Sequence, residues 1–146
     1  MDVETYFRSL YERVNEAESV PLRAVECAGW KPEQNQCHNN VIMWVRYDAE
    51  RSRVRGWLTW GKDEGGKCKL IAHSVVKENG ELYDITPIYP DTPRPSFISH
   101  LEADAEFDIL LPQYNDVTYP FFTYEELQAM GGVEDPSPID ESPDAF

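Results

Sequence analysis

The sequence predicts an α+β fold in which an N-terminal helix and a central helix pack on a small antiparallel β-sheet. Two segments carry apolar residues at helical spacing, and between residues 54 and 85 strand-like segments alternate with glycine-containing turns. The chain has 146 residues, which suits one domain. We expect a single globular domain over 1–132 and a disordered tail over 133–146, which holds five acids, three prolines and no base.

Two helices are predicted in the first third of the chain. Asp2 is a suitable cap for the first, which Pro21 limits, and its apolar face comprises Val3, Tyr6, Phe7, Leu10 and Val14. The second is expected from about 36 to 47, with Asn35 as its cap. Its apolar face comprises Cys37, Val41, Trp44 and Val45.

A three-strand antiparallel run follows, over 54–60, 68–76 and 81–85, with a loop at 61–67 and an Asn79-Gly80 turn. Further on, we expect a short helix within 95–107 capped by Ser96 and a strand within 107–114. The last predicted element is a short helix with Thr123 at its cap and Gly131 at its end.

The Asn-Gly turn fixes the register of the hairpin. If these two residues occupy the turn, Glu78 pairs with Glu81, and counting back places His73 and Asp84 on the same face as diagonal neighbours. Their Cβ atoms would lie roughly 7 Å apart, which an imidazole–carboxylate hydrogen bond can span. The carboxylate would orient the ring and stabilise its protonated form.

Cys37 is the candidate nucleophile for this pair. It lies at the start of a helix, where free N–H groups and the helix dipole favour a thiolate, and on the face that should meet the sheet. Gln34 and Gln36 are candidate donors to an oxyanion, together with the N–H of Cys37. His38 points about 100° around the helix, so we expect it to face solvent or the rim of a cleft, in a supporting role at most.

The strings "QCHNNV", "RGWL", "AHSVV" and "DITP" carry a resemblance that covers about residues 34–87. The order Cys, His, Asp resembles that of papain-like and transglutaminase-like cysteine enzymes, and the strings themselves are similar to those of small bacterial and phage proteins. The resemblance implies a papain- or transglutaminase-like core. It also implies that Cys37 is the nucleophile, His73 the general base and acid, and Asp84 the orienting carboxylate.

The predicted activity is thiol-dependent acyl transfer on a peptide or protein amide: hydrolysis, glutamine deamidation or a transglutaminase-like reaction. No metal or organic cofactor is implied. Trp57 is a candidate wall of a pocket shared with His73.

Two simpler readings stay open. A cysteine on an apolar helix face is often only a small buried hydrophobe. A metal site is the other, although no paired zinc-type spacing occurs among Cys27, Cys37, His38, Cys68, His73 and His100.

The formal charge of −14 argues against nucleic-acid and anionic-membrane binding, because phosphates would be repelled. It leaves open a non-enzymatic protein that binds or inhibits a basic partner. We expect no signal peptide, because the N-terminal stretch lacks a basic start before an apolar run, and no membrane-spanning segment. Three irregularly spaced cysteines favour a reducing, cytoplasmic setting.

Overall fold

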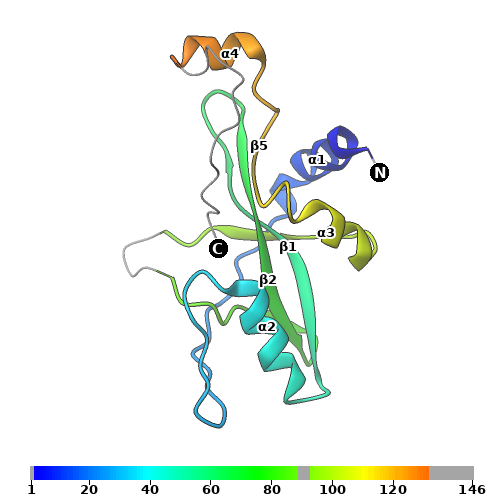
Figure 1. Ribbon diagram of the computed structural model, residues 1–146, viewed down its shortest axis with the longest axis vertical. Coiled ribbons are helices and arrows are strands. Elements are labelled where there is room, and N and C mark those ends of the chain that lie inside the picture. Colours follow the sequence, from blue (N-terminus) through cyan, green and yellow to red (C-terminus); the bar gives the residue numbers. More distant parts are fainter. Residues whose placement is uncertain (1, 89–92, 132–146) are drawn as a thin grey trace.

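The computed structural model describes residues 2–88 and 93–131 (Figure 1), and it is a mixed α+β fold with a curled antiparallel sheet. The helices are α1 (Val3–Glu12), a 3-10 turn (Val14–Glu16), α2 (Cys37–Arg46), α3 (Asp104–Leu110) and α4 (Tyr124–Ala129). The strands are β1 (Arg51–Lys62), β2 (Cys68–Glu78), β3 (Glu81–Tyr83), β4 (Ser96–Ser99) and β5 (Asp116–Tyr119). No described helix is both long and apolar enough to cross a membrane.

The long strand β2 organises the sheet. Along one edge it pairs with β1, which pairs in turn with β4. Its other edge is shared: β5 pairs with residues 68–71 and β3 with residues 76–78. Over the described chain, no strand pairs with residues 72–75 on this edge, and α2 lies across the sheet beside this part of β2 (Figure 1). The gap leaves room for the start of α2 to approach His73.

Helices cover the sheet at two places. Phe7 of α1 packs edge-on against Trp57 of β1, with ring centroids 5.2 Å apart. In α2, Val41 and Trp44 pack against a cluster that includes Tyr83, whose hydroxyl accepts a 2.8 Å hydrogen bond from the Trp44 indole. The apolar stripes predicted for both helices therefore face the core.

Gly56 lies where β1 is paired on both sides, opposite His73 in β2 and Ser99 in β4. A Cβ atom at this position would lie 2.8 Å from the ring of Phe97 and 2.9 Å from the Cα of Ser99. Any larger residue would push β4 away from β1.

The hairpin register is as predicted. Val76 pairs with Tyr83 and Glu78 with Glu81, while Asn79 and Gly80 have φ angles of 54° and 78°. Thr123 also caps α4 as expected, with a reciprocal capping box to Glu126. The tail predicted over 133–146 lies outside the described residues.

Three expectations were wrong. Residue Gln36, not Asn35, occupies the N-cap of α2, since Asn35 turns the chain with a φ of 61°. Ser96 begins β4 and caps no helix, because 96–99 pairs with β1 and Phe97 also bonds Glu18. The strand expected within 107–114 is mostly helix α3 and the turn after it.

Helix α3 forms because Phe107 and Leu110, three residues apart, bury one face. The buried Arg55 of β1 fixes it through ion pairs with Asp104 and Asp108.

Candidate active site

The predicted pair of His73 and Asp84 forms at the open end of the hairpin. The Nε2 atom of His73 lies 2.7 Å from Oδ2 of Asp84, and their side chains are only 2% and 5% exposed. Oδ1 of Asp84 accepts a 3.0 Å hydrogen bond from the N–H of Thr86. The backbone of Asp84 bonds Pro21 and Arg23, at 2.8 Å each, so the carboxylate has a fixed position.

Cys37 is the first residue of α2 and is fully buried. Burial raises the pKa of its thiol, but the imidazoles of His38 and His73 more than offset this effect and bring that pKa down to about 6. For His73, burial acts to lower the pKa, while Asp84 and then Cys37 raise it to about 10. Both shifts favour a thiolate–imidazolium pair near neutral pH.

The two ring nitrogens of His73 have different surroundings. Nε2 is held by Asp84, whereas Nδ1 is buried and has no partner of regular hydrogen-bond geometry in the described chain. Because Nε2 is held by Asp84, Nδ1 is the ring nitrogen left for the interaction with Cys37 that raises the pKa of His73.

His38 does not face open solvent, which was one of the two placements expected from its position on the helix. It is half-buried, with Nδ1 hydrogen-bonded to Ser74 and its ring edge-on to Phe107 at 6.2 Å. The gap in the outer edge of β2 receives this side chain. The thiol therefore has an imidazole from its own helix and another from the sheet.

Asn40 is a positioning residue that the sequence reasoning missed. It lies one turn after Cys37, is 3% exposed, and its amide N–H groups donate to Glu33 and to the Thr86 hydroxyl. The N–H of Glu33 donates back to its side-chain oxygen at 3.1 Å. These bonds tie the start of α2 to the segment carrying Asp84. Its position three residues after Cys37, on the apolar face of α2, was the available signal.

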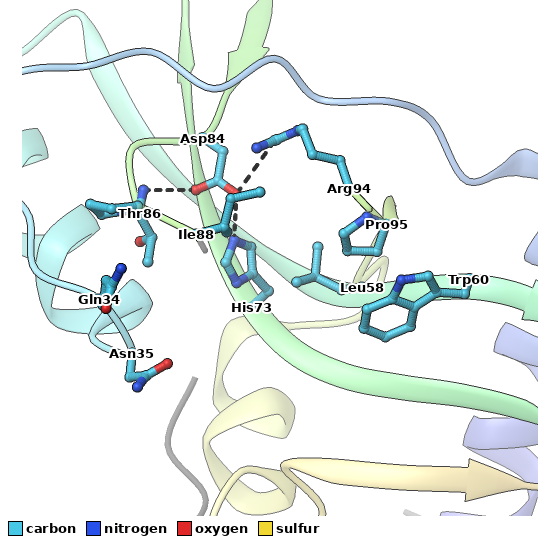
Figure 2. A pocket seen from close by; sticks show the side chains of 11 residues that line it. Gln34, Asn35, Leu58, Trp60, His73, Asp84, Thr86, Ile88, Arg94 and Pro95 are labelled. Carbon is cyan, nitrogen blue, oxygen red and sulfur yellow. Dashed lines mark hydrogen bonds and ion pairs between the residues drawn. The ribbon is translucent and has the colours of Figure 1, made fainter. Parts of the chain in front are cut away.

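A cavity of about 70 Å³ opens beside the pair. Figure 2 shows His73 and Asp84 between Gln34 and Asn35 on one side and Trp60 and Pro95 on the other. Leu58, Thr86, Pro87, Ile88 and Arg94 complete its lining. The cavity thus reaches both members of the pair, while Cys37 does not line it.

The predicted supporting residues fall in different places. Gln34 is exposed and lines the cavity. The side-chain oxygen of Gln36 accepts a 2.9 Å hydrogen bond from Asn39.

Trp57 does not share the cavity with His73, which corrects the expected pocket. The register sets Gly56 opposite His73 and so turns Trp57 to the other face, where its indole donates to Tyr6 at 2.8 Å. The relative register of β1 and β2 was not known from the sequence.

The remaining candidate ligands for a metal are dispersed. His100 accepts from the Tyr6 hydroxyl, which receives the Trp57 N–H, and its other nitrogen donates to the carbonyl of Ala103. Cys68 lies 3.1 Å from the Thr59 hydroxyl, and burial raises the pKa of its thiol. Within the described ranges, no three His, Cys, Asp or Glu side chains gather as a metal-binding group.

Comparisons with known proteins return no match: no family model fits the chain, and no curated protein or solved structure is significantly similar to it.

Proposed function

We propose that the protein is a thiol-dependent acyl-transfer enzyme in which Cys37 is the nucleophile, His73 the acid and base, and Asp84 the residue that orients His73. The observation that carries the proposal is the buried pair of His73 and Asp84, joined at 2.7 Å, with the buried thiol of Cys37 at the start of α2 beside the same imidazole. This arrangement lowers the pKa of Cys37 and raises that of His73. A purely structural cysteine has no need of such a partner, and burial alone raises the pKa of a thiol, as at Cys68.

In the first step the thiolate of Cys37 attacks the carbonyl carbon of an amide or thioester. The new S–C bond pushes the carbonyl electrons onto oxygen, and the first N–H groups of α2, which have no partner within the helix, can receive that charge. When the bond to the leaving group breaks, the leaving group takes the Nδ1 proton of His73.

In the second step water or an amine attacks the acyl-enzyme. Neutral His73 removes a proton from the attacking group, and the S–C bond breaks to restore the thiolate. Asp84 holds the ring in the orientation that both transfers need. A peptide or protein amide suits this chemistry, and the reducing, cytoplasmic setting proposed for the chain would keep Cys37 as a thiol.

The approach of a substrate is through the cavity. The sulfur is buried, whereas Gln34 and Asn35, which precede it by three and two residues, are exposed on the cavity wall. An acyl group that enters between these residues and His73 reaches the start of α2. The Cys–His–Asp order, which resembles that of papain-like and transglutaminase-like enzymes, supports the same reading.

The test is acylation by a small activated ester, p-nitrophenyl acetate, followed by acid quenching and intact-mass measurement. Wild-type protein should gain one acetyl group, mapped to Cys37, whereas Cys37→Ala should gain none at that rate. Cys27→Ser serves as the matched control, because it removes a partly exposed thiol outside the site.

His73→Ala should slow acylation strongly while leaving Cys37 in place. Labelling of Cys27 in preference to Cys37, or no adduct under conditions that modify a free thiol, would overturn the enzymatic proposal. The buried triad would then be structural. The charge of −14 would favour the alternative of a protein that binds a basic partner.

A further inference from the structure

The cavity beside His73 continues into a second hollow. Trp60, Arg94 and Pro95 line both, and the second hollow extends along β1 to Thr59 and Gly61. Trp60 is 46% exposed, so its indole presents an apolar surface at the junction of the two hollows. A ligand in this groove would meet apolar walls and one long basic side chain.

The described residues that line this groove differ in charge from the chain as a whole. The sequence has 27 acidic and 13 basic residues, yet Asp84 is the only acid among the described residues that line the two hollows. Its carboxylate is already engaged by His73, by the N–H of Thr86 and, at 3.9 Å, by Arg94. Among the described lining residues, the charge that remains for a ligand is therefore positive.

Arg94 supplies that charge. One of its amino groups donates to the carbonyl of Val20 and lies 3.9 Å from Asp84, which orients the guanidinium at the cavity (Figure 2). The side chain is 31% exposed, so further donors can reach a ligand. A guanidinium has five N–H donors in a planar fork that matches a carboxylate. The amino group that bonds Val20 occupies only some of these donors, so others remain for a ligand.

We propose that Arg94 binds an anionic group of the substrate, so that the site takes acyl compounds in which a carboxylate adjoins an apolar body. The carboxylate pairs with Arg94, and the apolar body lies against Trp60, Leu58 and Pro95. That the anion belongs to a substrate rests on the proposed acyl transfer, whereas anion binding at Arg94 can be tested independently of it.

The probes are benzoate and benzamide, which share a ring and differ in charge. Binding is followed by the shift of the Trp60 indole N–H in NMR spectra, assigned with Trp60→Phe. Wild-type protein should bind benzoate roughly tenfold more tightly than benzamide, as expected for a charge-assisted hydrogen bond at a partly exposed site. The preference should shrink as salt is added.

Arg94→Gln should remove the preference, and Arg94→Lys should keep part of it because the charge remains. Arg46→Gln is the matched control: it makes the same charge change at the exposed end of α2 and should leave the preference intact. Equal affinity for the two probes in wild-type protein would overturn the inference, as would a benzoate preference that survives in Arg94→Gln.

Alkylation links the anion site to the thiol. Cys37 attacks the methylene carbon of iodoacetate or iodoacetamide, a C–S bond forms, and iodide leaves with the electrons of the C–I bond. The rate ratio of iodoacetate to iodoacetamide should be higher at Cys37 than at Cys27 and should fall in Arg94→Gln. If Cys37 reacts with neither reagent while the benzoate preference persists, the anion site stands and the thiol-based function falls.

Discussion

Replacing Asp84 by Asn tests whether the carboxylate controls the thiol. The substitution keeps the shape of the side chain and an oxygen for the N–H of Thr86, but it places an amide donor against Nε2 of His73. The ring must then accept at Nε2, so a neutral His73 carries its proton on Nδ1. Without the carboxylate the imidazolium of His73 loses its main support, and the thiolate of Cys37 loses one of its two imidazole partners.

The size of the effect follows from the shifted pKa of Cys37. From about 6, that pKa should rise part of the way toward the ordinary value of about 8.5, because the carboxylate acts through His73 while the interaction with His38 remains. A full rise would cut the thiolate fraction at pH 6 from about one half to about 0.3%, so a factor of roughly 160 is the upper limit. A more basic thiolate is intrinsically the better nucleophile, which returns up to a factor of roughly ten. The rate at pH 6 should therefore fall, by at most about tenfold.

The assay is alkylation by iodoacetamide across pH 5 to 9, with the rate at Cys37 read by peptide mass spectrometry. Wild-type protein should show an inflection near pH 6, and Asp84→Asn should show one at clearly higher pH. Cys68 is an internal comparison, since its pKa is raised by burial and lacks an imidazole cause. Superimposable pH profiles of the two proteins at Cys37 would refute the reasoning.

Three further changes test the frame around the site. Gly56→Ala should lower the free energy of unfolding by about 1–3 kcal/mol in urea titrations, because its Cβ would collide with the carbonyl of Ile98; an unchanged midpoint would contradict the close packing. Asn40→Ala should cost about 2 kcal/mol by the same measurement, since the hydroxyl of Thr86 and nearby backbone lose buried partners; a cost below about 0.5 kcal/mol would argue against that network. Thr123→Ala should speed amide exchange in α4 while leaving the global unfolding midpoint unchanged, because α4 buries no residue; a lower midpoint would show that α4 supports the core.

The pairing of His73 with Asp84 was predictable because it depends on local chemistry. Two residues with positive φ make the Asn79-Gly80 turn, and such a turn sets the register of the strands that it joins. Because side chains alternate between the two faces of a strand, this register places His73 and Asp84 on the same face. The placement of Cys37 on the buried face of α2 was predictable for a similar reason, since helical periodicity alone puts it on the face that meets the sheet.

The arrangement around this pair depends on contacts between distant segments, which periodicity does not reveal. β5 begins at Asp116, which pairs with Ile71 from 45 residues away, and β2 is left without a strand partner on this edge just beyond that pair, where His38 bonds Ser74. Trp57 was named as a candidate pocket wall beside His73 without a known register, because β1 and β2 are joined by an irregular loop instead of a tight turn that would fix it. Arg94 gave no signal, since its proximity to Asp84 follows from the fold.

The thiolate–imidazolium pair should leave the pH dependence of stability unchanged in wild-type protein, and its loss should change that dependence in Cys37→Ala. The folded-state pKa of Cys37 is lowered to about 6, so its contribution to stability is lost as pH falls through that value. That of His73 is raised to about 10, so its contribution is lost as pH rises through that value. Between about pH 6.5 and 8.5 the folded pair and the unfolded pair each hold about one proton, on different atoms. The pair therefore does not make the free energy of unfolding vary with pH in this range.

Removing the thiol breaks that balance. In Cys37→Ala, Asp84 still raises the pKa of His73, so the folded chain keeps a proton that the unfolded chain has lost above about pH 6.5. The variant should then lose stability with rising pH, at roughly 1 kcal/mol per pH unit, relative to the wild-type curve. Urea titrations at several values between pH 6.5 and 8.5 measure the difference between the two slopes. Parallel curves would mean that no proton has moved from Cys37 to His73 in the folded protein, and a thiol that keeps its proton at neutral pH is a poor nucleophile for the proposed reaction.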